Sequence, residues 1–199
     1  MSKKIIESEV TSSNKYFRVI QTVKEYSDGK RFPIDEIVTS NKKINLEATE
    51  PAEMGGFCFS TYECVFRWLI RGDTLCEVTI PENTKVYKTV NENSVYVAEQ
   101  MILSNPQKLD DDFVMELYLN SKLPEKSYFV AMAACAICGY INTALKVFED
   151  KVNKSNVDIA ISEIDNFCQR REKEKMISNK SSTSYLKTIK EKLEQLKNS

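Results

Sequence analysis

The stretch GGFCFSTYECVFRWLIRGDTLCEVTIP, residues 55–81, indicates the fold of the first half of the chain. Gly55 and Gly56 let the backbone turn sharply into an aromatic strand, FCFST. Thr61 can cap the helix that follows, and Gly72 stands where a C′ glycine belongs. TLCEVTIP then alternates in the manner of a half-buried strand. The stretch therefore predicts a strand, a helix and a strand within one core.

Large side chains of this stretch form the expected core. The inward set is Phe57, Phe59, Phe66, Trp68, Leu75, Val78 and Ile80. On either side, KYFRVIQTV, TKVYKTV and EQMILS have the composition of further strands. A loop or a short helix is expected between the last two, and residues 34–54 are expected to be a connecting loop with one short strand.

The sequence becomes helical in character after residue 105. DDDFVMELYLNSKLP begins with carboxylates, which favour a helix N-terminus. The apolar segment that follows divides at Gly139 into two helices joined by a tight GYIN turn. Two more amphipathic segments, SNVDIAISEIDNFCQRREKEK and SYLKTIKEKLEQLKNS, predict two more helices.

Together these patterns predict the α+β class, with a small mixed α/β domain followed by an all-helical C-terminal module. We assign residues 1–14 to a flexible tail, 15–105 to the α/β domain and 110–199 to the helical module. Within the module, a helix pair occupies about residues 127–152 and two helices follow it.

The composition excludes several kinds of active site. The chain has 199 residues, no histidine and a net charge of -1. Catalytic triads with histidine and histidine-ligated zinc sites are therefore excluded, and no overall charge attracts nucleic acid or anionic membranes. The polar start MSKKIIESEVTSS predicts no secretory signal, and no apolar run approaches the about 20 residues of a membrane span. We expect an intracellular protein with reduced cysteines.

Cys135 and Cys138 form a CxxC motif inside the apolar segment AMAACAICGY. A redox or metal site needs exposed thiols of lowered pKa, or two further thiolates. Buried cysteines at a close helix contact are the favoured interpretation. We expect no metal site.

Two C-terminal features suggest binding surfaces. The run QRREKEK alternates basic and acidic residues, which is typical of a solvated helix face, although residues 169–197 could contact nucleic acid weakly. Leu186, Ile189, Leu193 and Leu196 have the spacing of a short coiled-coil seam. The seam could form a homodimer or pack back onto the helical module.

The order of strands in the first half resembles the core of the ADP-ribosyltransferase fold of the Arg-Ser-Glu type. Arg18 in YFRVI would match the arginine of that family, and Ser60-Thr61 in FCFST would match its serine motif. Its Glu-x-Glu motif would place Glu99 first and Met101 at the catalytic position, or, after a shift of two residues, Glu99 at the catalytic position. The resemblance implies NAD as cofactor, but a thioether cannot stabilise the oxocarbenium-like transition state. Structural or surface roles are the favoured interpretation of Arg18, Ser60 and Glu99.

A second resemblance covers roughly residues 15–150. GGFCFSTYECVFRWLIRGDTLCEVTIPENTKVY is similar to the N-terminal domain of uncharacterised proteins of large DNA viruses of amoebae, which often precedes ankyrin repeats. SYFVAMAACAICGYINTALKVFEDK resembles one such repeat, without its Thr-Pro-Leu-His start and without recurrence. The resemblance implies a viral protein of the host cytoplasm or virion and carries no known site residues.

These observations favour a non-catalytic viral protein that acts as a protein-interaction module, with no cofactor. An NAD-dependent transferase using Arg18, Ser60 and Glu99, and a weak nucleic-acid binder, are the alternatives. The first hypothesis predicts an exposed apolar patch on the helical module. The transferase predicts that its three side chains converge on one cleft.

Overall fold

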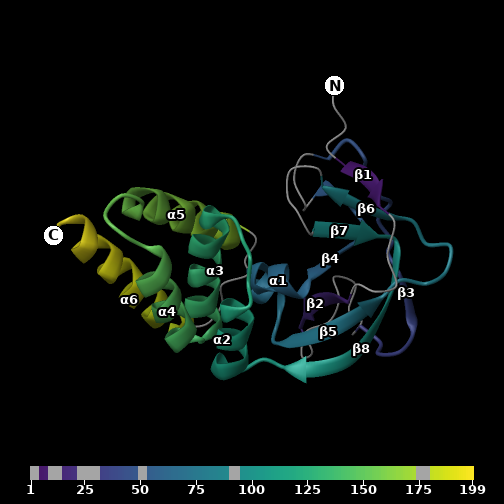
Figure 1. The fold of residues 1–199 in the computed structure, drawn as a ribbon, viewed down its shortest axis with the longest axis horizontal. Helices are drawn as coiled ribbons and strands as arrows, with labels where there is room; N and C mark the ends of the chain where they lie inside the picture. The colour runs from purple at the N-terminus through teal and green to yellow at the C-terminus, as the bar shows by residue number, and fades with distance from the viewer. Residues whose placement is uncertain (1–4, 9–14, 22–31, 49–52, 90–94, 174–179) are drawn as a thin grey trace. The chain divides into compact units, whose positions relative to one another are not determined.

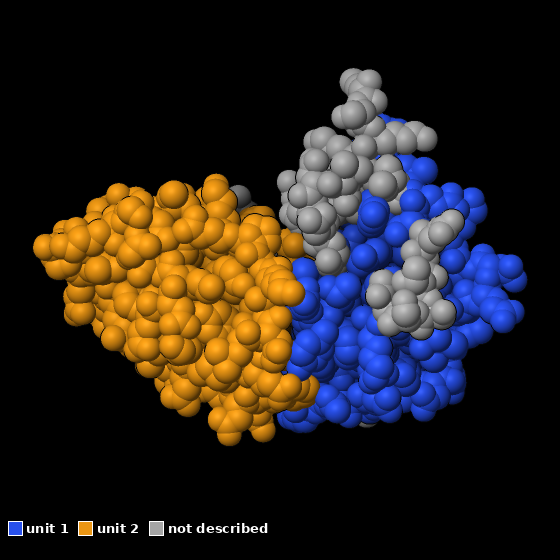
Figure 2. All heavy atoms as spheres, viewed as in Figure 1, with its two compact units in different colours: residues 1–65, 71–109 blue, residues 66–70, 110–199 orange. Residues whose placement is uncertain are grey.

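The computed structural model describes residues 5–8, 15–21, 32–48, 53–89, 95–173 and 180–199 (Figure 1). The chain forms two compact units, shown in different colours in Figure 2. Unit 1 contains residues 1–65 and 71–109, and unit 2 contains residues 66–70 and 110–199. The structure is mixed α/β, and five residues from the middle of the predicted α/β domain cluster with the helices of unit 2.

Unit 1 is built on an eight-stranded antiparallel sheet. Its strands are β1 (Ile5–Ser8), β2 (Tyr16–Ile20), β3 (Ile37–Thr39), β4 (Phe57–Thr61), β5 (Thr74–Thr79), β6 (Val86–Thr89), β7 (Val95–Ala98) and β8 (Gln100–Lys108). The order across the sheet is β1-β6-β7-β4-β2-β5-β8-β3. The predicted short strand in residues 34–54 is β3. A strand, β7, occupies the place where a loop or a short helix was expected.

The expectation of a flexible tail over residues 1–14 is wrong for residues 5–8. These residues form β1, which pairs along its whole length with β6 from Ile5↔Thr89 to Ser8↔Val86. The β-branched Ile5 and Ile6 suit a strand, but their partner lies about 80 residues away in the sequence. The other residues of the predicted tail, 1–4 and 9–14, lie outside the described residues.

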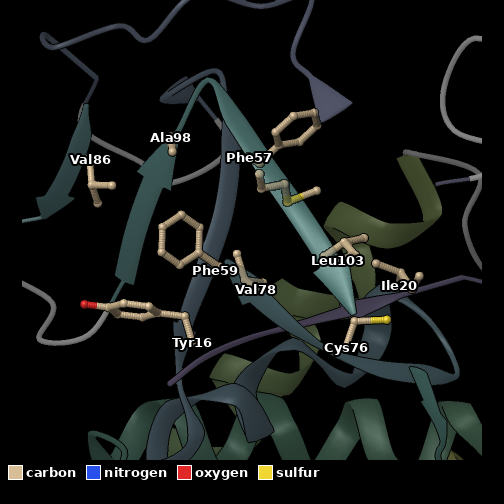
Figure 3. Packing of buried hydrophobic residues seen from close by; sticks show 10 residues of the cluster. Tyr16, Ile20, Phe57, Phe59, Cys76, Val78, Val86, Ala98 and Leu103 are labelled. Atoms are coloured by element: carbon tan, nitrogen blue, oxygen red, sulfur yellow. The ribbon is translucent and has the colours of Figure 1, made fainter. Parts of the chain in front are cut away.

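The sheet is bent around its core. Only Glu99 separates β7 from β8 in the chain, yet three strands, β4, β2 and β5, lie between them in the sheet. The sheet must therefore curve to bring these two strand ends together. The enclosed face carries the cluster shown in Figure 3, whose buried members are Tyr16, Ile20, Phe57, Phe59, Cys76, Val78, Val86, Ala98, Met101 and Leu103. Burial of these side chains supplies the main stabilisation of unit 1.

The opposite face of the sheet carries a second, smaller cluster. Cys58 and Val97 alternate with members of the first cluster and pack with Ala48 and Met54. Of the predicted inward set, Phe57, Phe59, Phe66, Leu75 and Val78 are buried, whereas Trp68 and Ile80 are partly buried. The stretch that indicated the fold is therefore largely core.

The predicted helix after β4 is interrupted. It begins as α1 (Tyr62–Val65) and continues as the 3-10 helix η2 (Phe66–Arg71). Gly72, expected in a left-handed C′ conformation, is not among the glycines with positive φ. A Cβ at this position would lie 1.9 Å from the carbonyl oxygen of Ile20, so a close approach of two backbones requires the glycine.

Unit 2 contains α2 (Asp111–Leu119), α3 (Glu125–Cys138), α4 (Ile141–Lys151), α5 (Val157–Lys173) and α6 (Lys180–Lys197). The predicted helix pair is α3 and α4, and Gly139 ends α3 with a φ of 94°. Helix α3 is buried on nearly all sides and packs against α4, α5 and α6. An apolar central helix of this kind is the expected core of a helical bundle.

Asp111 connects α2 to the start of α4. Its carboxylate accepts hydrogen bonds from the backbone N–H groups of Asn142, at 2.9 Å, and Thr143, at 3.0 Å. The Thr143 hydroxyl donates to the same carboxylate at 2.7 Å. Asp111 thus satisfies N–H groups at the helix N-terminus and complements its dipole.

The seam of α6 lies inside unit 2. Ile189 and Leu193 are buried, Leu186 and Leu196 are partly buried, and α6 packs against α3 and α5. Of the two alternatives that the spacing allowed, the structure shows packing onto the helical unit, and the homodimer through these residues stays a prediction. No helix in the described part of the chain is long and apolar enough to cross a membrane.

Candidate binding site

An open pocket of about 470 Å³ lies in unit 1 at the corner where β7 passes into β8. Residues from four separate segments line it: Thr39, Ile44, Leu46, Asn83, Thr84, Lys85, Tyr87, Glu99 and Gln100. The pocket lies at this corner because the bent sheet brings β3, which pairs with β8, to the same place as β6, which pairs with β7. We call it the corner pocket.

One wall of the corner pocket is the segment of residues 40–48, and Glu99 holds it. The backbone carbonyl of Glu99 accepts a hydrogen bond from the Ser40 N–H at 2.8 Å. Its carboxylate oxygen Oε1 accepts one from the Ile44 N–H at 3.3 Å. Further along, the Asn45 N–H donates to the Met54 carbonyl at 2.8 Å. The wall is therefore fixed by hydrogen bonds at several points.

Gly55 and Gly56 hold the same wall. Both have positive φ, 70° and 59°, and the Gly56 N–H donates to the carbonyl of Lys42 at 3.1 Å. A Cβ on Gly55 would lie 2.0 Å from the carbonyl oxygen of Lys43. From the sequence, this glycine pair was expected to form the turn into β4. Its second role, the close approach to a segment far away in the chain, left no local signal.

The floor of the pocket is a chain of three polar side chains. The Thr84 hydroxyl donates to Gln100 Oε1 at 3.1 Å, and Gln100 Nε2 donates to the hydroxyl oxygen of Thr39 at 3.2 Å. Asn83 precedes them in a turn with a φ of 64°, a conformation that asparagine tolerates better than most residues. The chain of bonds fixes the orientation of the Gln100 amide across the pocket.

Two charged side chains line the corner pocket. Lys85 Nζ is 3.3 and 3.4 Å from the two carboxylate oxygens of Glu7 on β1, an exposed ion pair. Glu99 is exposed, and within the described residues its Oε2 accepts no hydrogen bond. The pocket therefore offers one accessible carboxylate, which forms no ion pair within the described residues.

The structure separates two of the residues that the transferase hypothesis requires. In the pairing of β2 with β4, Phe17 lies opposite Ser60, so these two side chains share one face of the sheet. Arg18 follows Phe17 and therefore points to the other face. There its guanidinium donates to the Cys58 carbonyl and lies 5.4 and 5.7 Å from the ring centres of Phe32 and Phe57.

Ser60 is fully buried, and its hydroxyl makes no hydrogen bond within the described residues. Glu99 lies in the corner pocket, which neither Arg18 nor Ser60 lines. Met101, the alternative occupant of the catalytic position, is a core residue with 0% exposure. The structure thus brings none of the three predicted transferase residues together.

The CxxC motif lies inside α3. Cys135 is fully buried, and burial raises the pKa of its thiol well above the usual value, with Cys138 and Asp111 adding to the shift. Cys138 contacts the Leu69 carbonyl oxygen at 3.7 Å. No group of three acidic, cysteine or histidine side chains suited to a metal occurs in the part of the chain that the structure describes. The structural interpretation of these thiols fits their surroundings.

Acidic neighbours accompany several basic residues at the C-terminal end. Lys190 is 2.6 Å from Asp165, Lys197 is 2.8 Å from Asp158, and Lys187 pairs with Glu191 within α6. Residues 174–179, which include the end of the QRREKEK run, lie outside the described residues. This alternation of charge is the pattern of a solvated helix surface.

Comparison with models of protein families, with curated proteins and with solved structures finds no match to this chain. The two resemblances noted in the sequence therefore stay hypotheses. Function has to be inferred from the chemistry of the corner pocket itself.

Proposed function

We propose that the chain is a non-catalytic protein-interaction module, and that the corner pocket of unit 1 receives a segment of the partner protein. The observation that carries the proposal is an open pocket of about 470 Å³ whose wall and floor are already held by hydrogen bonds. Ligand sites are commonly preformed concave surfaces of this size. The lining here is mostly polar, with Ile44, Leu46 and Tyr87 as its apolar members.

The rigidity of the pocket favours binding. The wall is held at Ser40, Ile44 and Asn45, and the floor is held through the Gln100 amide. A pocket that is ordered before its ligand arrives loses less conformational entropy on association than a flexible one.

A polypeptide suits the site because apolar and polar groups alternate along it. Leu46 lines the pocket and is 39% exposed, and Ile37, two residues before Thr39 on the same side of β3, is 58% exposed. Strand β3 stands at the end of the sheet order. A partner in extended conformation could place apolar side chains on Ile37 and Leu46 and polar groups in the pocket, as in strand addition to a sheet edge.

The alternatives have less support. The transferase needs Arg18, Ser60 and Glu99 in one cleft, whereas Arg18 and Ser60 lie on opposite faces of the sheet. In the helical unit, Leu119, Ile159 and Tyr185 are the large exposed apolar side chains of the described residues, each from a different helix. Single exposed apolar residues are normal on protein surfaces, so these three do not by themselves support the apolar patch that was predicted there.

The sequence resemblances also suggest an evolutionary origin for this protein. An ankyrin-like unit in the α3–α4 hairpin and a transferase-like core in the sheet stay hypotheses that rest on the sequence resemblances. A viral protein of the host cytoplasm or virion is the setting that the sequence resemblance implies.

The experiment that tests the proposal uses binding peptides selected on the full chain. A random dodecapeptide display library is enriched on the immobilised protein, and the selected peptides are titrated by fluorescence anisotropy. Leu46→Glu places a charge at the pocket, and we expect it to abolish binding. Ile159→Glu makes the same kind of change on α5 at a matched exposure, 41% against 39%, and we expect unchanged affinity.

Thermal melts confirm that both variants are folded before their affinities are compared. Equal affinity of Leu46→Glu and the wild type would place the binding surface elsewhere and refute the proposal. Failure to enrich any peptide would also count against it, because a preformed recognition pocket should select ligands from such a library.

A further inference from the structure

The corner pocket presents an accessible carboxylate, that of Glu99. We propose that it recognises a lysine side chain of the partner protein, whose ammonium group binds to Glu99 and Thr84. The inference rests on the proposed function, and it specifies the chemical class of the group that enters the pocket.

The carboxylate of Glu99 is the first reason. Its Oε1 accepts the Ile44 N–H at 3.3 Å, a long bond, and Oε2 accepts no hydrogen bond from the described residues. The side chain lines the pocket and is exposed, so the charge is accessible to a ligand. Hydrogen bonds from a cation to a carboxylate are about twice as strong as neutral ones.

Within the described residues, Glu99 forms no ion pair with the lysines of the pocket region. Lys85 is paired with Glu7 through both carboxylate oxygens. Lys42 and Lys43 belong to the wall, but their side chains are not part of the pocket lining, and the Lys42 carbonyl accepts the Gly56 N–H. The charged side chains of the lining are Lys85 and Glu99, and Lys85 is engaged by Glu7 on β1.

The hydroxyl oxygen of Thr84 is a second acceptor for the ammonium group. The Thr84 hydroxyl gives its only proton to Gln100 Oε1, so the lone pairs of the Thr84 oxygen stay available as acceptors. Thr84 and Glu99 line the same pocket. An ammonium group has only donors to offer, and it therefore matches a site whose available groups are a carboxylate and a hydroxyl oxygen.

The apolar surroundings favour a lysine within a polypeptide over a free amine. The pocket wall includes Ile44 and Leu46, which can contact the methylene stem of a lysine. Ile37 extends the apolar surface along β3. A free polyamine would leave Ile37 uncovered, whereas an extended peptide would bury it.

The test compares two variants that each remove one negative charge. Glu99→Gln keeps an oxygen for the Ile44 N–H and removes the charge inside the pocket. Glu47→Gln is the control, because Glu47 is exposed on the same wall segment and does not line the pocket. The probes are the display-selected dodecapeptides, each also made with lysine replaced by norleucine, and spermidine as a free cation.

We expect the selected peptides to share a lysine. Glu99→Gln should weaken their binding about tenfold or more, the factor expected for the loss of one charge-assisted hydrogen bond, and Glu47→Gln should leave it unchanged. The norleucine peptides should bind the wild-type protein more weakly than the lysine peptides by the same factor, and Glu99→Gln should not change their affinity further. Chemical shifts of the Ile44 and Gln100 amides should follow the titration.

Other outcomes separate the inference from the proposed function. Selected peptides without a lysine that still lose affinity in Leu46→Glu would overturn the inference and leave the interaction module intact. Equal losses in Glu99→Gln and Glu47→Gln would reduce the effect to long-range charge and also overturn it. Peptides that ignore Leu46→Glu would refute the proposed function itself. Spermidine binding that is lost in Glu99→Gln, with no peptide enriched, would assign the pocket to a free polyamine and overturn the lysine assignment.

Discussion

At the scale of single residues, two glycines with left-handed backbone conformations have different surroundings. Gly55 and Gly139 both have positive φ, at 70° and 94°. They differ in their surroundings, since a Cβ on Gly139 would meet nothing within 4 Å and a Cβ on Gly55 would lie 2.0 Å from a backbone oxygen. An alanine at Gly139 would therefore cause backbone strain alone, whereas an alanine at Gly55 would cause both backbone strain and steric overlap.

We predict that Gly139→Ala lowers the free energy of unfolding by about 1–2 kcal/mol, the strain of the left-handed conformation alone. Gly55→Ala should lower it further and should also displace the pocket wall, because the Lys43 carbonyl cannot yield as a flexible side chain would. Chemical denaturation of the two variants measures the difference. Equal losses of unfolding free energy in the two variants would show that the pocket wall can shift at no cost, contrary to the prediction.

Among the elements, we expect the contact between α2 and α4 to depend on pH. Tyr118 donates its hydroxyl to Asp150 Oδ2 at 2.9 Å, and Lys146 lies 2.7 Å from Oδ1 of the same carboxylate. Burial raises the pKa of Tyr118, and the bond to Asp150 raises it further. The hydrogen bond from Lys146 lowers the pKa of Asp150.

A group whose pKa is raised by folding stabilises the folded state below its unfolded pKa and loses this effect as the pH rises. We therefore expect the wild type to be more stable than Tyr118→Phe near neutral pH, by about 1 kcal/mol for one hydrogen bond. The difference should shrink above about pH 10, the ordinary tyrosine pKa. It should also shrink in acid, where Asp150, whose pKa is depressed, becomes protonated.

Urea titrations of both proteins at several pH values measure this difference directly, and subtraction removes the effect of other titrating groups. A constant difference from neutral pH to pH 11 would contradict the proposed linkage.

At the scale of the whole molecule, the packing of α6 predicts the state of association. Its seam is internal, with Ile189 at 0% and Leu193 at 1% exposure. The spacing of the apolar residues is the same for a dimer and for an intramolecular bundle, so only the contacts of α6 with α3, α4 and α5 decide between them.

We expect Ile189→Ala to destabilise the protein by about 2–5 kcal/mol without changing its mass in solution. Light scattering should give 22.9 kDa for both proteins over a wide range of concentration. Lys187→Ala, on the exposed side of the same helix, should have little effect on stability. If the wild type had twice this mass and Ile189→Ala had a lower mass, the result would support the homodimer instead.

Much of the local structure was predictable from the sequence. The α3–α4 hairpin follows from an apolar segment that is interrupted by Gly139, and β4 and β5 follow from aromatic and alternating segments. These predictions succeed because helix and strand periods, turn residues and caps act over a few residues. The amphipathic segments of α5 and α6 were evident for the same reason.

The features that the sequence did not predict depend on strand pairing between distant parts of the chain. Strand β1 exists because β6 pairs with it, and the faces of Arg18 and Ser60 are set by the register of β2 against β4. A strand's period of two residues shows which side chains share a face, but the relative phase of two strands depends on partners far away in the chain.

By itself, the sequence determined the mixed α/β character of the fold, the exclusion of histidine chemistry and most of the helices, because these depend on composition and local pattern. Only the tertiary structure decided that the α6 seam is internal and that Thr39, Thr84 and Glu99 line one pocket. The physical reason is that β7 and β8 are adjacent in the chain but have three strands between them in the sheet. The bend that rejoins them, and so the pocket, arises from non-local strand pairing.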